Sequence, residues 1–230
     1  MVLEFMRRRA APLLLVIYDC DGVLVDSEPV ANRVVAEELT ALGWAMTAAE
    51  SDGHFLGLTF SDMQPIIERQ LGRALTAEWK ASLVQKVIDA MAEGVEAIPG
   101  AVEALRATTG LGLAWRVASN SSHEEMWVKF GRLGISELVA GRVHSHRDVA
   151  RGKPAPDLFL AAAAAQGVLP EHCVVIEDSV PGATAAAAAG MPCLGYAAHH
   201  DGGRLRAAGA VPFGSMFELP GLLAAGMAGR

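Results

Sequence analysis

Short apolar runs recur along the chain, and segments with helical patterns separate them. The runs are Leu13–Tyr18, Leu113–Ala118, Cys173–Ile176 and Pro192–Tyr196, with a weaker one at Leu138–Val143. Continuously apolar strands that alternate with helices are typical of a parallel sheet that is covered on both faces. The pattern therefore predicts an α/β fold built on a parallel sheet.

The stretch from residue 28 to residue 96 has a different pattern, which is helical throughout. Its helical segments are residues 31–44, 61–72 and 76–95. Ser61 and Thr76 are the candidate N-caps of the second and third segments, and no strand candidate interrupts them. We therefore predict a core domain formed by residues 1–27 and 97–230, with residues 28–96 inserted into it as a helical domain.

Composition excludes several classes of function. The chain is 52% hydrophobic and 20% charged, as expected of a globular protein. Its net charge is −7 and it has no long basic run, so we expect neither nucleic acid nor a membrane surface as a partner. Three widely spaced cysteines suit reduced thiols better than disulfides. No segment approaches the ~20 apolar residues of a membrane span, and we predict a soluble, cytoplasmic protein.

Polar clusters follow the three main strands of the predicted sheet. These clusters are Asp19-Cys20-Asp21-Gly22, Ser119-Asn120-Ser121 and Glu177-Asp178-Ser179. A further polar element, with Lys153, lies in a loop between the second and third of these strands. The carboxyl ends of parallel strands meet at one edge of a sheet, where ligands bind. We therefore expect carboxylates, a hydroxyl and a lysine to converge there.

This set of side chains indicates phosphoryl transfer. Acids from separate strands form an oxygen-only site of the kind that Mg²⁺ prefers. The ion offsets the repulsion between the carboxylates and neutralises phosphate oxygens during transfer. A lysine and a serine hydroxyl supply the remaining phosphate contacts. One carboxylate can then act as nucleophile, and a second one two residues along can act as general acid and base.

In their order and spacing, these motifs resemble those of the haloacid dehalogenase superfamily of aspartyl phosphatases. The first motif matches DCDGVLVDSE, residues 19–28; the others match at Ser119, at Lys153 in GKPAPDLF, and at Glu177-Asp178-Ser179. The resemblance extends from residue 13 to about residue 196. It implies a Rossmann-like core with an inserted α-helical cap, here residues 28–96.

The resemblance also implies a role for each motif residue. Asp19 would be the nucleophile and Asp21 the general acid and base. The implied catalytic residues are Asp19, Asp21, Ser119 and Lys153. The implied phosphate-binding residues are Gly22, Ser119, Asn120 and Lys153. The implied Mg²⁺ ligands are Asp19, Asp21 through its backbone carbonyl, and Asp178, with Glu177 in or beside that set.

Several related activities share this core chemistry. A haloacid dehalogenase needs neither the second aspartate nor Mg²⁺, so Asp21 argues against it. A β-phosphoglucomutase has a histidine where this chain has Ala31, and cap bases around a glycine where this chain has residues 55–60, FLGLTF. These differences favour hydrolysis, and a phosphosugar mutase is the alternative. The non-enzyme alternative is a receiver-type signalling domain, which also combines acids, a hydroxyl and a lysine. Such a domain is about half this length and lacks the helical insertion, which argues against it.

The expected partner is a small phosphorylated metabolite, namely a sugar or sugar-acid monophosphate. The chain is similar to bacterial sugar-phosphate phosphatases, including the 6-phosphogluconate type, and phosphoglycolate is an alternative substrate. Residues 28–96 hold 11 acids and 5 bases, so a bulky polyanion is a poor fit. His144 with His146, and His199 with His200, lie outside the motifs and offer no full zinc ligand set. Oligomeric state is left open.

Overall fold

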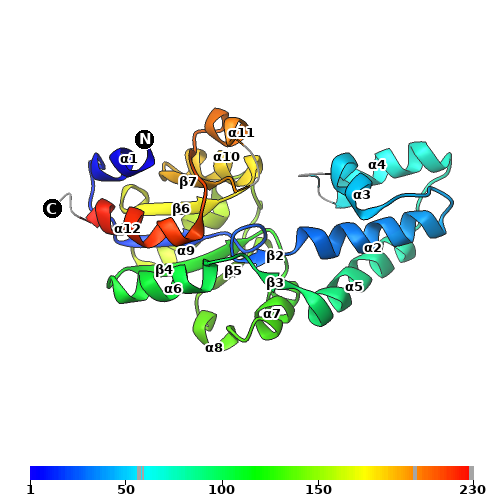
Figure 1. Ribbon diagram of the computed structural model, residues 1–230, viewed down its shortest axis with the longest axis horizontal. Helices are drawn as coiled ribbons and strands as arrows, with labels where there is room; N and C mark the ends of the chain where they lie inside the picture. The colour runs from blue at the N-terminus through cyan, green and yellow to red at the C-terminus, as the bar shows by residue number, and fades with distance from the viewer. Residues whose placement is uncertain (56–57, 59, 199–200, 228–230) are drawn as a thin grey trace. The chain divides into compact units, whose positions relative to one another are not determined.

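The computed structural model describes residues 1–55, 58, 60–198 and 201–227 (Figure 1). The chain divides into two compact units. The core unit consists of Met1–Asp26 and Ala97–Arg230, and the helical unit is Ser27–Glu96. Among the described residues, no helix is long and apolar enough to cross a membrane.

A six-stranded sheet with the order β5-β4-β1-β6-β7-β8 organises the core unit. Its strands are β1 (Leu15–Tyr18), β4 (Ala114–Ser119), β5 (Val143–Ser145), β6 (Cys173–Glu177), β7 (Cys193–Tyr196) and β8 (Val211–Phe213). All neighbouring strands are parallel. Separately, β2 (Val25–Asp26) pairs with β3 (Glu96–Ala97). The predicted α/β fold with a parallel sheet is confirmed.

Helices cover both faces of this sheet. The core unit's α-helices are α1 (Val2–Arg7), α6 (Ala101–Gly110), α7 (His123–Arg132), α8 (Ser136–Val139), α9 (Asp157–Gln166), α10 (Val180–Ala188), α11 (Gly203–Ala207) and α12 (Leu219–Met227). Alanines of α9 and α10 pack with Leu15 and Ile17 of β1 on one face. On the other face, the Tyr18 hydroxyl is 2.6 Å from Oγ1 of Thr108 in α6. Helices α1 and α12 lie side by side (Figure 1).

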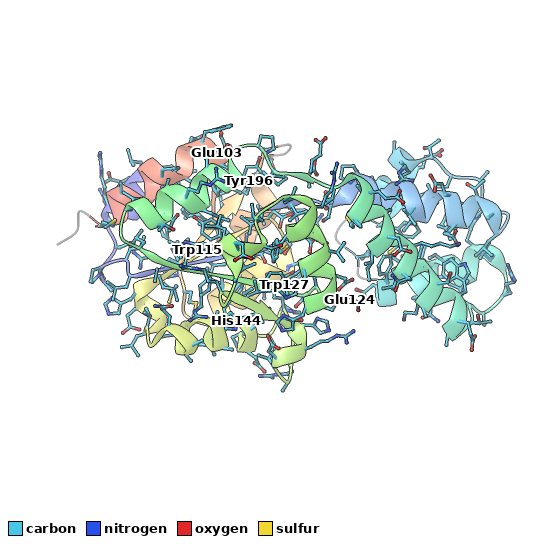
Figure 2. The ribbon with its side chains drawn as sticks, turned by 90° about the horizontal axis from the view of Figure 1, so that it is seen from below. Glu103, Trp115, Glu124, Trp127, His144 and Tyr196 are labelled. Carbon is cyan, nitrogen blue, oxygen red and sulfur yellow. The ribbon has the colours of Figure 1, made fainter. Side chains whose placement is uncertain are left out.

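Strand β4 shows how burial on both faces accounts for the apolar runs. Trp115 points into the packed interior (Figure 2) and is 1% exposed. Its ring NH donates to Oγ1 of Thr109 in α6 at 2.8 Å. The guanidinium of Arg142 lies 4.5 Å from the centre of its ring. A strand with this environment needs few polar positions, which is why its sequence reads as a continuous apolar run.

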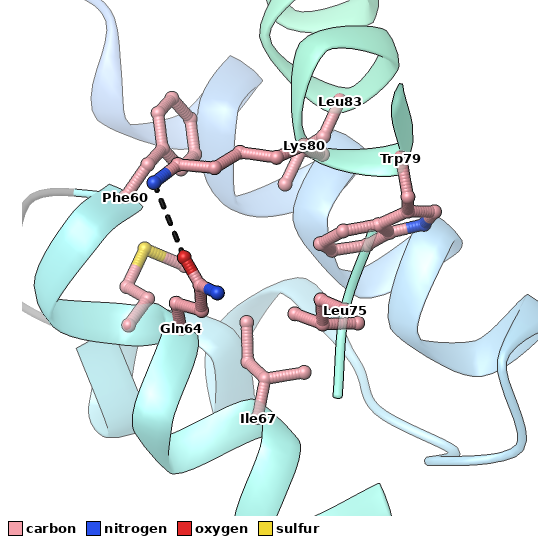
Figure 3. Close-up of a pocket in the computed structure, with 8 residues that line it drawn as sticks. Phe60, Gln64, Ile67, Leu75, Trp79, Lys80 and Leu83 are labelled. Carbon is pink, nitrogen blue, oxygen red and sulfur yellow. Dashed lines mark hydrogen bonds between the residues drawn. The ribbon is translucent and has the colours of Figure 1, made fainter. Parts of the chain in front are cut away.

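The helical unit consists of α2 (Glu28–Ala41), α3 (Ala48–Phe55), α4 (Phe60–Leu71) and α5 (Ala77–Gly94). Apolar side chains of α4 and α5 face each other around a small pocket (Figure 3). At its rim, Lys80 Nζ donates to Oε1 of Gln64 at 3.2 Å. Thr76 caps α5 as predicted, since its hydroxyl accepts from the Trp79 backbone NH at 3.1 Å.

Two sequence-based assignments differ from the structure. The weaker strand at Leu138–Val143 is wrong, because its first two residues belong to α8 and β5 begins only at Val143. Between them, Gly141 adopts a positive φ of 73°, which ends the helical turn. Ser61 is not an N-cap, because α4 begins one residue earlier.

We expect Thr76→Ala to lower the free energy of unfolding by about 1 kcal/mol, because the first turn of α5 loses its side-chain acceptor. Urea denaturation of both proteins measures this difference. Thr184→Ala is a matched control, since the Thr184 hydroxyl bonds within α10 to the carbonyl of Val180 and caps no helix. Equal effects of the two substitutions would contradict the capping role.

Candidate active site

The carboxyl ends of β1 and β6 bring three carboxylates together. Asp19 directly follows β1, Glu177 is the last residue of β6, and Asp178 follows it. Each offers an oxygen, and these oxygens lie within 4.8 Å of one another. The backbone NH of Asp19 still bonds to the carbonyl of Ile176 at 2.9 Å, so sheet pairing continues into the site. The register of the central strands therefore fixes this acidic cluster.

Lys153 supplies the positive charge that this acidic cluster requires. Its Nζ donates to Oδ1 of Asp19 at 2.7 Å and to Oε1 of Glu177 at 2.7 Å. The ammonium also lies 4.8 Å from the centre of the Phe159 ring. All three charged side chains are largely buried, so each charge is stabilised by its ion-pair partner in place of water.

The Asp19 carboxyl remains perturbed despite this ion pair. Burial raises the pKa of Asp19 to about 7; the Lys153 charge opposes this rise, and the carboxylates of Glu177 and Asp21 add to it. A divalent cation would oppose the rise further, because it favours the ionised form. The site thus has an excess of negative charge that a cation would relieve.

Glu177 holds the two residues before α10 through hydrogen bonds. Its Oε2 accepts from the backbone NH groups of Asp178 and Ser179, at 3.0 and 2.9 Å, and from the Ser179 hydroxyl at 2.8 Å. A side chain at Gly182 would overlap the Glu177 carboxyl group. Since Oε1 binds Lys153, Glu177 links the lysine to the start of α10.

The Asp21 carboxylate is directed at other partners. Its Oδ1 accepts from Lys129 Nζ at 2.6 Å, and its Oδ2 accepts from the Ser121 hydroxyl at 2.8 Å. The hydroxyl of Ser119 lies 3.5 Å from the same Oδ2. Among the described residues, the carboxylates grouped for an ion do not include that of Asp21. Its predicted metal contact through the backbone carbonyl stays a prediction.

Asn120 and Gly22 shape the loops around the carboxylates. The Asn120 amide donates to the Lys153 carbonyl at 3.0 Å and accepts from the Lys153 NH at 2.9 Å. The side chain of Asn120 thus holds the loop of Lys153, and its predicted phosphate contact stays a prediction. Gly22 has a positive φ of 73°, and a Cβ there would overlap the Asp178 carboxylate. Only glycine allows this close approach.

Sequence reasoning missed Lys129, and it placed Ser121 in the polar cluster after the second strand without giving it a partner. Lys129 lies on the buried face of α7, between Met126 and Phe130 in helical register. Burial by itself would lower the pKa of Lys129, but the charge and hydrogen bond of Asp21, together with the charges of Cys20 and Glu125, outweigh this effect and raise it. A lysine on an otherwise apolar helix face was the available signal. Its partner could not be read from the sequence, because Asp21 is 108 residues away.

Among the described residues, the pair His144 and His146 is not part of this cluster. His144 Nε2 lies 3.2 Å from Nη1 of Arg116, and burial followed by the Arg116 charge lowers the pKa of His144. In the part of the chain that the structure describes, the group with metal-ligand spacing contains carboxylates alone. His199 and His200 lie outside the described residues, as do Leu56, Gly57 and Thr59 of the stretch that distinguishes a mutase.

The donor set fits a hard divalent cation such as Mg²⁺. All three candidate ligands are carboxylates, and the neighbouring charged groups are the second carboxylate of the first motif and two lysines. Carboxylates therefore outnumber ammonium groups by two, which matches the charge of one such ion. Oxygen ligands from two strands are the donors that Mg²⁺ prefers.

Comparison with known families identifies this arrangement. Residues 13–190 match the haloacid dehalogenase-like hydrolases. The chain therefore belongs to the haloacid dehalogenase-like hydrolase family, and the predicted superfamily is confirmed. The phosphatases among its relatives support the same enzyme class, a phosphoric monoester hydrolase.

Three similar proteins illustrate the relationship. The chain is 31% identical to the 6-phosphogluconate phosphatase of Escherichia coli over 80% of its own length and 82% of the relative's. It is 30% identical to hexitol phosphatase A of the same organism, over 82% and 85%. A family hydrolase from Deinococcus radiodurans, solved with bound phosphate and sodium, is 35% identical, with a TM-score of 0.80 over 94% of this chain and 98% of that one.

The raised pKa of Asp19 predicts a pH-dependent stability in metal-free buffer. Because its pKa of about 7 lies above that of the unfolded chain, the folded state binds this proton more tightly. The stabilising contribution of that proton is complete at low pH and is lost as the pH rises from ~4 to ~7. Asp19→Asn does not titrate, so its stability relative to the wild type should increase over this range.

Chemical denaturation of both proteins in EDTA, at several pH values from 4 to 8, measures this trend. Asp89→Asn, on the exposed surface of α5, is the matched control. A stability difference between Asp19→Asn and the wild type that stays constant with pH would contradict the perturbed state of Asp19.

Proposed function

We propose that the protein is a Mg²⁺-dependent phosphatase that hydrolyses a sugar or sugar-acid monophosphate through an aspartyl-phosphate on Asp19. The observation that carries this proposal is the buried group in which Lys153 bridges Asp19 and Glu177, with Asp178 beside them. A nucleophilic carboxylate, a cation for the phosphoryl oxygens and a metal-binding carboxylate are thereby within reach of one centre.

In the first half-reaction, an oxygen of Asp19 attacks the phosphorus atom and the bond to the sugar oxygen breaks. Asp21, which is protonated when this step begins, gives its proton to that leaving oxygen. Ser119 and Lys153 hold the phosphoryl oxygens by a hydrogen bond and by charge. Asp19 and Asp178, with the backbone carbonyl of Asp21, would hold the Mg²⁺, which neutralises charge on the phosphoryl group. The products are the free alcohol and phosphorylated Asp19.

In the second half-reaction, Asp21 takes a proton from a water molecule, which attacks the phosphorus atom. The bond to Asp19 breaks, inorganic phosphate leaves, and both carboxyl groups return to their starting states. A single group can serve as acid and then as base, because the proton that it loses in the first step is regained in the second.

The substrate class rests on the relatives and on charge. Two relatives are named for 6-phosphogluconate and for hexitol phosphates, and both are matched over more than four fifths of their length. The helical unit, inserted directly after the first motif, is proposed as the cap that selects the substrate. Its acidic balance disfavours bulky polyanions.

Phosphate release from a panel of metabolites tests the proposal. The panel contains 6-phosphogluconate, hexitol phosphates, phosphoglycolate and β-glucose 1-phosphate, each with and without Mg²⁺. Asp19→Asn should reduce turnover by about 10³-fold or more, because the amide is not a nucleophile. Turnover that survives in Asp19→Asn would reject Asp19 as the nucleophile. Isomerisation of β-glucose 1-phosphate without phosphate release would favour the mutase.

The metal assignment predicts a separate effect for Asp178→Asn. Loss of a residue that only orients a metal ligand commonly weakens metal binding by about 10–100-fold. Loss of a ligand itself should therefore raise the Mg²⁺ concentration for half-maximal activity by at least that factor. Asp157→Asn is a matched control, because Asp157 pairs with Arg151 on the surface at the start of α9. An unchanged Mg²⁺ requirement in Asp178→Asn would reject Asp178 as a ligand.

A further inference from the structure

Lys129 is a buried lysine to which the proposed mechanism gives no role. It lies in α7 with 6% of its surface exposed, next to the fully buried Met126 and Phe130. Replacing a buried ion pair with apolar side chains is often neutral or stabilising, so the fold alone does not require a lysine here. The contacts of its ammonium group indicate what it does.

The Lys129 ammonium group, the Asp21 carboxylate and the Ser121 hydroxyl form a small hydrogen-bonded triangle. Lys129 Nζ is 2.6 Å from Oδ1 of Asp21 and 3.1 Å from the Ser121 hydroxyl. That hydroxyl donates to the other oxygen, Oδ2 of Asp21, at 2.8 Å. Each oxygen of the carboxylate therefore has its own donor, and rotation of the carboxyl group would break both contacts.

The triangle is itself firmly held. The carbonyl of Ser121 accepts from the Ser145 hydroxyl at 2.8 Å, which ties it to the end of β5. The next residue, Ser122, is the N-cap of α7 and forms a capping box with Glu125. The loop after β4 and the helix that carries Lys129 are thus one fixed support.

This support also places the Asp21 carboxylate beside one of the predicted phosphoryl-binding residues. With Lys129 and Ser121 in place, Oδ2 of Asp21 lies 3.5 Å from the hydroxyl of Ser119. A proton donor must be within hydrogen-bond reach of the leaving oxygen, and small displacements cost much of its effect.

We propose that Lys129 and Ser121 are positioning residues that hold the Asp21 carboxylate at the phosphoryl site. This inference rests on the proposed function, because it assumes that Asp21 is the acid and base. Neither residue contacts the substrate in this role; both act through Asp21. Their loss should therefore affect proton transfer and leave substrate binding unchanged.

The test compares Lys129→Met and Ser121→Ala with the wild type on two esters. One is the alkyl phosphate of the panel that the wild type hydrolyses fastest. The other is 4-nitrophenyl phosphate, whose leaving group departs without a proton. On the alkyl ester, kcat should fall by about 10–100-fold at unchanged KM, a part of the 10²–10⁴ that acid–base catalysis supplies. Lys86→Met, on the exposed surface of α5, is the matched control.

On 4-nitrophenyl phosphate the two half-reactions should separate. A rapid burst of nitrophenolate should persist in both variants, because phosphorylation of Asp19 then needs no acid. The slow phase should fall with the alkyl-ester rate, because water attack still needs Asp21 as a base. Loss of the burst in both variants would overturn the positioning role, since it would indicate damage to Asp19 or to phosphate binding.

A double-mutant cycle with Asp21→Asn separates positioning from general damage. In the Asp21→Asn background, Lys129→Met should reduce turnover no further, because its effect passes through the lost carboxylate. Losses that multiply would overturn the inference. Thermal unfolding checks that each variant is folded. If Lys129→Met does not fold, Ser121→Ala takes its place in the same cycle. A wild type without turnover would overturn the proposed function and this inference together.

Discussion

The ion pairs of Lys153 with Asp19 and Glu177 constrain the rest of the structure. A buried carboxylate without a compensating charge would be expelled or protonated, and here two of them share one ammonium group. Glu177 in turn binds the backbone at the start of α10, where only glycine fits at position 182. The alanine-rich packing of α9 and α10 against β1 brings these groups to one edge of the sheet. Core packing and site chemistry are therefore parts of one arrangement.

Two different lysines pair with the two aspartates of the first motif at this edge of the sheet. Lys153 reaches Asp19 from the loop before α9, while Lys129 reaches Asp21 from α7. The two aspartates are only two residues apart, so without this division their carboxylates would compete for one cation. Separate lysine partners give each carboxylate a distinct environment, which is what a nucleophile and an acid–base group require.

The sequence was informative where local patterns carry the signal. The strands that bear the site were placed within a residue or two, because burial on both faces leaves continuous apolar runs. The edge strand β8 was missed, since three residues with a central proline give little periodicity. Lys129 and the Asn120 contact were missed because they depend on pairings across 108 and 33 residues. Spacing shows which residues meet at a sheet edge, and long-range packing decides how each side chain is oriented there.

The contact between Asn120 and Lys153 has a consequence for evolution and for engineering. One amide side chain satisfies both the NH and the carbonyl of Lys153, so the loop after β4 acts as a template for a loop 33 residues further on. The conformations of the two segments therefore depend on each other, although the sequence separates them. A chimera that takes the lysine loop from one relative and the asparagine loop from another would mismatch this template. Loop exchange within the family should therefore transfer both segments as a unit.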